Sequence, residues 1–165
     1  MELYLLRHGE ATPQESGVPD VERALTRRGR SDVRSVLKAA QRAGLAPRFI
    51  LTSPLRRARE TAAVAARLFG SSQVIASDRL KPAAAAKGIW TELGQLPDEP
   101  SVLLVGHDPH LSHLAAFLLE APLVIDFKKA GLVRIDCSEC TGPPRGVLKW
   151  IITDRKSTRL NSSHT

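Results

Sequence analysis

Residues 1–11 have the sequence MELYLLRHGEA, in which an apolar run at residues 3–6 ends abruptly at RHGE, residues 7–10. A short apolar run bounded by polar residues and glycine is typical of a buried β-strand. Residues 102–105 (VLLV) repeat this arrangement and end at GHD, residues 106–108. Because α/β proteins bind ligands at the carboxyl ends of their parallel strands, we expect the two histidines to meet at one edge of a sheet.

Apolar segments alternate with helical patterns along the rest of the chain. Strands are expected at residues 3–6, 49–52, 74–76, 102–105, 132–136 and 147–152, the last two forming an antiparallel hairpin, and helices at about residues 26–44, 54–69, 83–96 and 109–119. Thr26 is a suitable N-cap for the first helix and Gly44 a suitable end. Strands that alternate with helices are typical of α/β proteins. The pattern therefore predicts a three-layer sandwich, with a mostly parallel central sheet flanked by helices.

Residues 1–153 are expected to form one domain, because no linker divides them and they contain no internal repeat. Residues 154–165 differ in character, since they are polar, rich in Ser, Thr and Arg, and without apolar periodicity. Such a composition does not supply a packed core. We expect this tail to be non-native or disordered, and we assign no functional residue to it.

The charge balance favours an anionic partner. The 165 residues include 24 Lys and Arg against 17 Asp and Glu, for a formal charge of +7. Aromatic residues make up only 4%, which leaves few surfaces on which nucleic-acid bases could stack. No apolar run approaches the roughly 18 residues that span a bilayer, and the N-terminus lacks the features of an export signal. We expect a cytoplasmic protein, a monomer, that binds neither nucleic acid nor membranes.

The strand ends supply the residue types that phosphoryl transfer needs. A phosphoryl group carries negative charge on its equatorial oxygens, so its transfer requires several cationic donors and a nucleophile in line with the leaving atom. Arg7, Arg57 and His107 can supply the donors, and Arg57 lies on the helix expected after the second strand. His8 can supply an imidazole nucleophile that becomes phosphohistidine and is then hydrolysed by water. This chemistry requires neither a metal ion nor a cofactor.

Four motifs resemble the histidine phosphatase superfamily in their order and spacing. They are LRHGEA at residues 6–11, LTRRG at 25–29, SPLRRARETA at 53–62 and VGH at 105–107. Together they are spread over most of residues 1–152, and the short chain is similar to the phosphohistidine phosphatases of the SixA kind. The resemblance implies a phosphoglycerate-mutase-like fold without a large helical cap.

The resemblance also implies roles for individual residues. His8 would be the phosphorylated nucleophile, and Arg7, Arg57 and His107 would form the phosphate pocket. Arg57 is favoured over its neighbour Arg56, because the arginine of the family lies four residues after the serine and precedes an alanine. The implied function is hydrolysis of phosphohistidine on a protein. A small-molecule phosphomonoesterase that uses the same mechanism is the alternative, and a phosphate-binding protein without activity is a third reading.

The short segment between Ser53 and His107 leaves no room for the helical subdomain that covers the site in larger members of the superfamily. An open site suits a phosphorylated side chain on another protein. Gly9 and Ser53 are also expected to bind the substrate: Gly9 would let a ligand approach the backbone, and Ser53 would in addition cap the helix that carries Arg57. Glu10 is a candidate proton donor, or else it orients the local backbone and balances the arginines.

Two patterns in the sequence resemble metal-binding motifs, but neither supplies a complete set of ligands. His107, His110 and His113 form an HxxHxxH pattern, but residues six apart on a helix point away from each other. Cys137 and Cys140 form a CxxC pattern without the second pair that a closed zinc site needs. We therefore expect no metal site.

The proposed roles predict a pH dependence. His8 must be neutral to attack, whereas His107 adds positive charge to the pocket when protonated. An activity maximum is expected between the two titrations, and Arg7 and Arg57 are expected to lower both pKa values.

Overall fold

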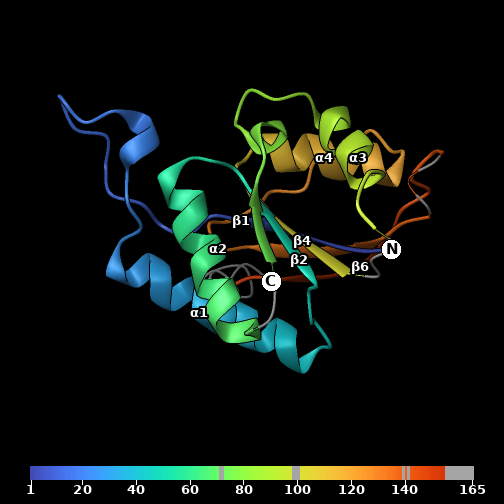
Figure 1. The fold of residues 1–165 in the computed structure, drawn as a ribbon, viewed down its shortest axis with the longest axis horizontal. Coiled ribbons are helices and arrows are strands. Elements are labelled where there is room, and N and C mark those ends of the chain that lie inside the picture. Colours follow the sequence, from blue (N-terminus) through green and yellow to red (C-terminus); the bar gives the residue numbers. More distant parts are fainter. Residues whose placement is uncertain (71–72, 98–100, 139, 141, 155–165) are drawn as a thin grey trace, which may run out of the picture.

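The computed structural model describes residues 1–70, 73–97, 101–138, 140 and 142–154, and its centre is a mixed β-sheet (Figure 1). In this part of the chain the strands are β1 (Glu2–Arg7), β2 (Phe49–Thr52), β3 (Gln73–Ala76), β4 (Ser101–Gly106), β5 (Leu132–Asp136) and β6 (Val147–Ile152). Their order across the sheet is β3-β2-β4-β1-β5-β6. Neighbours from β3 to β1 pair in parallel, and β5 pairs antiparallel with both β1 and β6. The predicted mostly parallel sheet with a closing hairpin is confirmed.

Two pairs of helices cover the two faces of this sheet (Figure 1). The helices α1 (Arg27–Arg42) and α2 (Arg56–Phe69) pack on one face, and α3 (Ala86–Leu93) and α4 (His110–Leu119) pack on the other. Two short 3₁₀ helices, η1 (Asp20–Glu22) and η2 (Asp78–Leu80), lie in the connections. The three-layer sandwich expected from the sequence is therefore confirmed, and no large helical cap occurs among the described residues.

The side chains of β1 alternate between the two faces of the sheet, and this explains why its apolar run is continuous. Tyr4 and Leu6 pack in the core beneath α1 and α2, whereas Leu3 and Leu5 pack in the core beneath α3 and α4. Successive side chains of a strand point to opposite faces, so a strand buried on both faces needs apolar residues at every position. All four side chains are completely buried.

The predicted helix limits lie within two residues of the observed ones, except in α3. Thr26 is the N-cap of α1, where its Oγ1 accepts the Gly29 N–H at 2.9 Å. The α3 helix is shorter than the predicted 83–96 by three residues at each end. At its C-terminal end the chain bonds in the tighter i→i+3 pattern, from Gln95 N–H to Glu92 and from Leu96 N–H to Leu93. Such 3₁₀-type bonding commonly ends a helix. The α2 helix begins at Arg56, two residues after the predicted start at residue 54.

Sheet pairing places three strand ends side by side. In the parallel pair β1–β4, Arg7 lies opposite Gly106, and the His8 N–H donates to the Gly106 carbonyl at 3.0 Å. On the other side of β4, the Ser53 N–H donates to the Val105 carbonyl at 2.9 Å. These backbone bonds fix the residues that follow β1, β2 and β4 at the same edge of the sheet.

The C-terminal tail is expected to be non-native or disordered. Residues 155–165 lie outside the described residues, so the nature of the tail stays a prediction. No helix in the described ranges has both the length and the apolar character needed to cross a membrane.

Two glycines allow α1 to pack closely against the turn after β1. A Cβ at Gly9 would lie 2.8 Å from the Gly29 carbonyl oxygen, and a Cβ at Gly29 would lie 2.2 Å from the Glu10 carbonyl oxygen. Real Cβ atoms do not approach backbone so closely, so both positions require glycine. The N–H of Gly9 also donates to Thr61 Oγ1 at 3.2 Å. Helix packing therefore explains Gly9, and its predicted contact with a ligand remains a prediction.

We expect Gly29→Ala to lower the free energy of unfolding by about 2 kcal/mol or more, because its Cβ would overlap backbone that cannot move alone. Urea unfolding would measure the change. Gly88→Ala in α3 is the matched control, since its Cβ would meet no neighbour closer than 3.7 Å and alanine favours helix. Equal effects of the two substitutions would contradict the packing argument.

Candidate functional site

His8 lies directly after β1 with its side chain almost fully buried, at 7% exposure. Its Nδ1 is 2.7 Å from the Gly9 carbonyl oxygen. A carbonyl oxygen only accepts hydrogen bonds, so Nδ1 carries the ring proton and donates it. The other nitrogen, Nε2, therefore keeps its lone pair and is the atom that can act as a nucleophile.

The environment of His8 keeps the imidazole neutral. Its pKa is lowered from 6.5 to about 4, chiefly because burial disfavours the charged ring. The hydrogen bond to Gly9 acts in the opposite direction, and the positive charges of Arg57 and Arg7 lower the pKa further. The expected effect of the arginines is thus present, although burial is the larger cause.

His107 follows β4 and faces His8, with ring centroids 5.2 Å apart in an edge-on arrangement. Its Nε2 is 2.8 Å from Ser53 Oγ, and its buried Nδ1 has no hydrogen-bond partner in the described part of the chain. Burial, the neighbouring His8 and Arg57 lower the pKa of His107 to about 3. Both imidazoles are therefore neutral in the free protein near pH 7. The activity maximum expected between the two titrations stays a prediction.

Ser53 supports His107 instead of capping a helix. The N-cap of α2 is Leu55, which makes no side-chain cap, and the helix begins at Arg56. Ser53 Oγ accepts the Leu55 N–H at 3.3 Å, within the turn before the helix, and meets the His107 ring. The predicted helix cap was therefore wrong, because the distant histidine that occupies this hydroxyl is not apparent from local sequence.

Two arginines lie beside the histidines and are held by backbone carbonyls. Arg7 Nη1 donates to the Phe127 carbonyl at 2.7 Å, and Arg57 Nη1 donates to the Asp20 carbonyl at 3.0 Å. The Nε atoms of both arginines are buried and have no acceptor among the described residues. Arg57 is itself 5% exposed, and burial lowers its pKa. Both arginines keep unused donors in the region of His8.

Arg56 occupies a different environment from Arg57. It lies on the exposed side of α2, where its Nε is 3.6 Å from Glu60 Oε2. The structure thus places Arg57 with His8 and His107, as the sequence predicts, and Arg56 on the surface.

The segment before α1 contributes two residues that the sequence analysis missed. Asp20 Oδ2 is 3.3 Å from Arg57 Nη2, and Asp20 Oδ1 is 2.9 Å from Arg23 Nε. Arg57 and Arg23 lower the pKa of Asp20 against the opposing effect of burial. An acidic residue three positions before an arginine, just ahead of LTRRG, is visible in the sequence. No local pattern, however, indicates that this segment folds back onto α2.

Glu10 is tied to the start of α1. Its Oε2 accepts the Thr26 hydroxyl at 2.8 Å, which agrees with the local orienting role. Glu10 also lines a groove of about 450 Å³ that contains Arg7 and the basic residues Arg28, Lys128 and Lys129. Its role as a proton donor stays a prediction.

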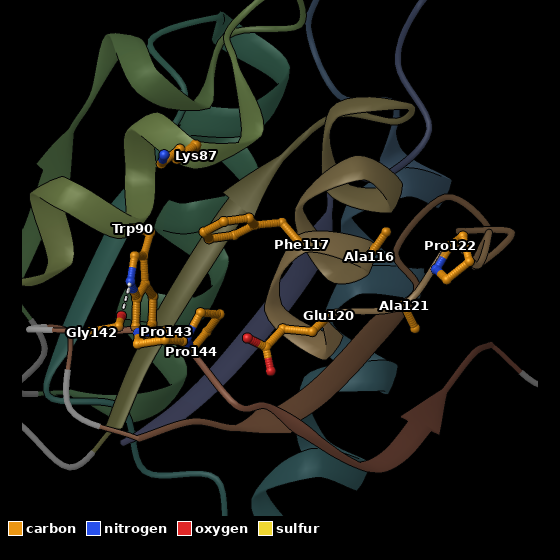
Figure 2. Close-up of a pocket in the computed structure, with 10 residues that line it drawn as sticks. All are labelled: Lys87, Trp90, Ala116, Phe117, Glu120, Ala121, Pro122, Gly142, Pro143 and Pro144. Atoms are coloured by element: carbon orange, nitrogen blue, oxygen red, sulfur yellow. Dashed lines mark hydrogen bonds between the residues drawn. The ribbon is translucent and has the colours of Figure 1, made fainter.

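A larger and more apolar pocket lies away from the histidines (Figure 2). It has a volume of about 620 Å³ and is formed where the end of α4 meets α3 and residues 142–144. Figure 2 shows Trp90 bonded to the Gly142 carbonyl, with Phe117 on the neighbouring helix. His107 precedes the opposite end of α4, so this pocket does not belong to the histidine site.

The residues with metal-binding potential are dispersed. No three His, Cys, Asp or Glu side chains are grouped at ligand spacing within the described ranges. His110 is buried at the start of α4, whereas His113 is exposed. Cys137 and Cys140 are free thiols, and burial raises the pKa of Cys137 to about 12.

Comparisons with known proteins define the family. The model of the histidine phosphatase superfamily (branch 1) matches residues 3–91. An uncharacterised protein of Picosynechococcus is 34% identical over 137 residues, which cover 81% of this chain and 83% of that protein. The chain therefore belongs to the histidine phosphatase superfamily, as the four sequence motifs indicate.

Solved structures show the same fold. The protein histidine phosphatase SixA in complex with tungstate superimposes with a TM-score of 0.83 at 22% identity, covering 93% of this chain and 97% of SixA. A SixA described as a putative phosphohistidine phosphatase from Agrobacterium tumefaciens gives 0.77 at 24% identity, with coverage of 92% and 97%. A mycobacterial glucosyl-3-phosphoglycerate phosphatase gives 0.65 at 19% identity, with coverage of 90% and 97%. The fold is thus found with both protein and small-molecule phosphatases.

We expect Arg57→Ala to lower kcat/KM for a phosphorylated substrate about 100-fold or more, which is the usual effect of losing one preorganised donor. Arg56→Ala is the matched control on the same helix turn and should change kcat/KM less than about threefold. Steady-state kinetics of the two variants would measure the difference. A larger loss in Arg56→Ala would contradict the assignment of Arg57.

The buried histidines also predict how stability depends on pH. Because their folded-state pKa values lie below 6.5, the unfolded chain binds protons that the folded chain does not, and stability falls as pH is lowered from about 6.5 toward 4. His107→Gln should reduce this fall by on the order of 2 kcal/mol between pH 7 and 4.5. The exposed His113→Gln serves as the control, and urea unfolding at both pH values is the measurement. An unchanged fall in His107→Gln would contradict the burial of a neutral ring.

Proposed function

We propose that this protein is a metal-independent phosphatase that removes the phosphoryl group from phosphohistidine on another protein, through a phosphohistidine intermediate at His8. One observation carries the proposal. A neutral His8 with its Nε2 lone pair faces His107 and lies within electrostatic reach of Arg7 and Arg57, and each of these three residues has a buried polar atom without a partner among the described residues: Arg7 Nε, Arg57 Nε and His107 Nδ1. Leaving buried polar groups unpaired costs free energy, and a bound phosphoryl group would supply acceptors.

In the first step, the His8 Nε2 lone pair forms a bond to phosphorus while the bond from phosphorus to the leaving nitrogen breaks. The electron pair of that bond stays on the departing imidazole, which takes up a proton. In the second step, a water oxygen attacks phosphorus, the bond to Nε2 breaks, and inorganic phosphate and neutral His8 are released. The water loses its proton to the phosphate or to solvent. No step requires a metal ion or a cofactor.

The surrounding donors stabilise the charge on the transferring group. Arg7 and Arg57 are preorganised by their backbone anchors, so little rearrangement is needed when charge builds up on the equatorial oxygens. Ser53 Oγ already accepts the Leu55 N–H, and its own hydrogen can point to His107 Nε2. In this arrangement the ring proton of His107 is on Nδ1, which becomes a donor. A bound anion also favours protonation of His107.

A protein substrate is supported by the connection between α2 and β4. Its described residues form β3, η2 and α3, which extend the sheet and cover one of its faces. Without a cap, the site can admit a side chain that projects from another protein. A phosphohistidine leaving group is itself readily protonated, so it needs a strong general acid less than an ester does. Glu10 remains the candidate donor if one is used.

A small phosphate ester is the second candidate substrate. The groove beside Arg7 carries Arg28, Lys128 and Lys129, which could bind a further anionic group of a metabolite in exchange for their present carboxylate neighbours, Asp32 and Asp126 among them. The similar fold of the glucosyl-3-phosphoglycerate phosphatase supports this alternative. Cytoplasmic location and a monomeric state stay predictions under either candidate.

The deciding experiment compares a phosphohistidine-bearing protein with an aryl phosphate in the presence of a chelator. We expect chelator-resistant release of phosphate that prefers the phosphoprotein, and its loss in His8→Ala, because His8 Nε2 is the atom proposed to attack phosphorus. His113→Ala on the exposed surface is the control. Hydrolysis of the ester alone would indicate that the substrate is a small phosphorylated metabolite and not a phosphoprotein. Activity that persists in His8→Ala, or that disappears with chelator, would overturn the mechanism.

A further inference from the structure

The Asp20 carboxylate bridges two arginines at the edge of the site. One oxygen lies 2.9 Å from Arg23 Nε and the other 3.3 Å from Arg57 Nη2. Asp20 belongs to η1, in a largely exposed segment that leaves the body of the domain between β1 and α1 (Figure 1). Its contacts with Arg57 are therefore an anchor between this segment and α2.

We propose that Asp20 is a positioning residue. It holds the Arg57 guanidinium in the orientation in which the Nε side of the group donates hydrogen bonds to the phosphoryl oxygens. This inference rests on the proposed phosphatase function. It adds to that function a residue that does not touch the substrate but acts through Arg57.

The distribution of donors supports this role. A guanidinium has five N–H donors in a fixed plane. Asp20 engages both terminal nitrogens of Arg57, Nη1 through its backbone carbonyl and Nη2 through its carboxylate. The Nε atom is buried and has no acceptor among the described residues. The Nε and Nη2 pair is a geometry that binds phosphate oxygens in a bidentate manner.

Charge gives a second reason for the carboxylate. Arg23 and Arg57 repel each other, and the charge of Arg23 lowers the pKa of Arg57, whereas Asp20 raises it. Arg57 is 5% exposed, and a buried cation is stable in one orientation only when it is paired. Without the carboxylate, only one of the two Asp20 contacts would remain, the bond from Nη1 to the backbone carbonyl, and the guanidinium could tilt about it away from Arg23.

A competing role predicts the opposite result. If the carboxylate simply occupied the anion site until substrate arrived, its removal would strengthen anion binding. Removing a negative charge near an anionic substrate also favours binding on electrostatic grounds alone. A loss of activity in Asp20→Ala would therefore oppose the electrostatic trend, and orientation of Arg57 would account for it.

The test is a double-mutant cycle between Asp20 and Arg57. We expect Asp20→Ala alone to lower kcat/KM about 10-fold to 100-fold. It should also weaken tungstate binding, measured by thermal shift. In the Arg57→Ala background, Asp20→Ala should change kcat/KM less than about twofold. Glu22→Ala is the matched control, because it removes a carboxylate from the same 3₁₀ helix. Asp20→Glu, which keeps the charge, should restore part of the lost activity.

Either of two results would overturn the proposal. One is an additive effect of the two substitutions, and the other is tighter tungstate binding in Asp20→Ala. These results differ from a failure of the proposed function, which would appear as absence of His8-dependent phosphatase activity in the unmodified protein. The cycle is measured on whichever phosphorylated substrate the unmodified protein hydrolyses.

Discussion

The parallel pairing of β1 with β4 is the constraint on which the rest of the site depends. The two strands leave the sheet in register, and the bond from the His8 N–H to the Gly106 carbonyl continues their pairing beyond the last strand residue. The chain brings these strands together from opposite halves of its sequence. Once they pair, His8 and His107 must face each other, and only side-chain rotation remains to be fixed.

Four anchors in three connections of the chain, β1–α1, β2–α2 and α4–β5, then fix the side chains. The Gly9 carbonyl sets the tautomer of His8, Ser53 meets His107, and the carbonyls of Phe127 and Asp20 hold the two arginines. Backbone carbonyls are suited to this task because their positions are set by the fold. A substrate that enters the site therefore meets donors whose orientation has already been determined.

The sequence predicts the fold and the central residues well because their signals are local. An apolar run that ends in RHG, a Thr26 cap and a helix after the second strand are each visible within a few residues. The misplaced features depend on contacts between distant segments. The partner of Ser53 is 54 positions away, and that of Arg57 is 37 positions away. Gly9 also depends on a distant segment, since α1 packs into the space that its missing side chain leaves.

Burial determines the protonation states of the two histidines, and therefore the role that each can have. The low pKa of His8 keeps its nucleophilic lone pair free across the neutral range, but the same surroundings also leave His107 uncharged in the free protein. A dianionic phosphoryl group changes this balance, because it favours a proton on the ring that faces it as a donor. In the proposed mechanism, His8 is the ring that forms a bond to phosphorus, so it cannot take up that proton at Nε2. The positive charge of the proposed pocket would then come from the arginines before the substrate binds, and His107 would add to it only afterwards.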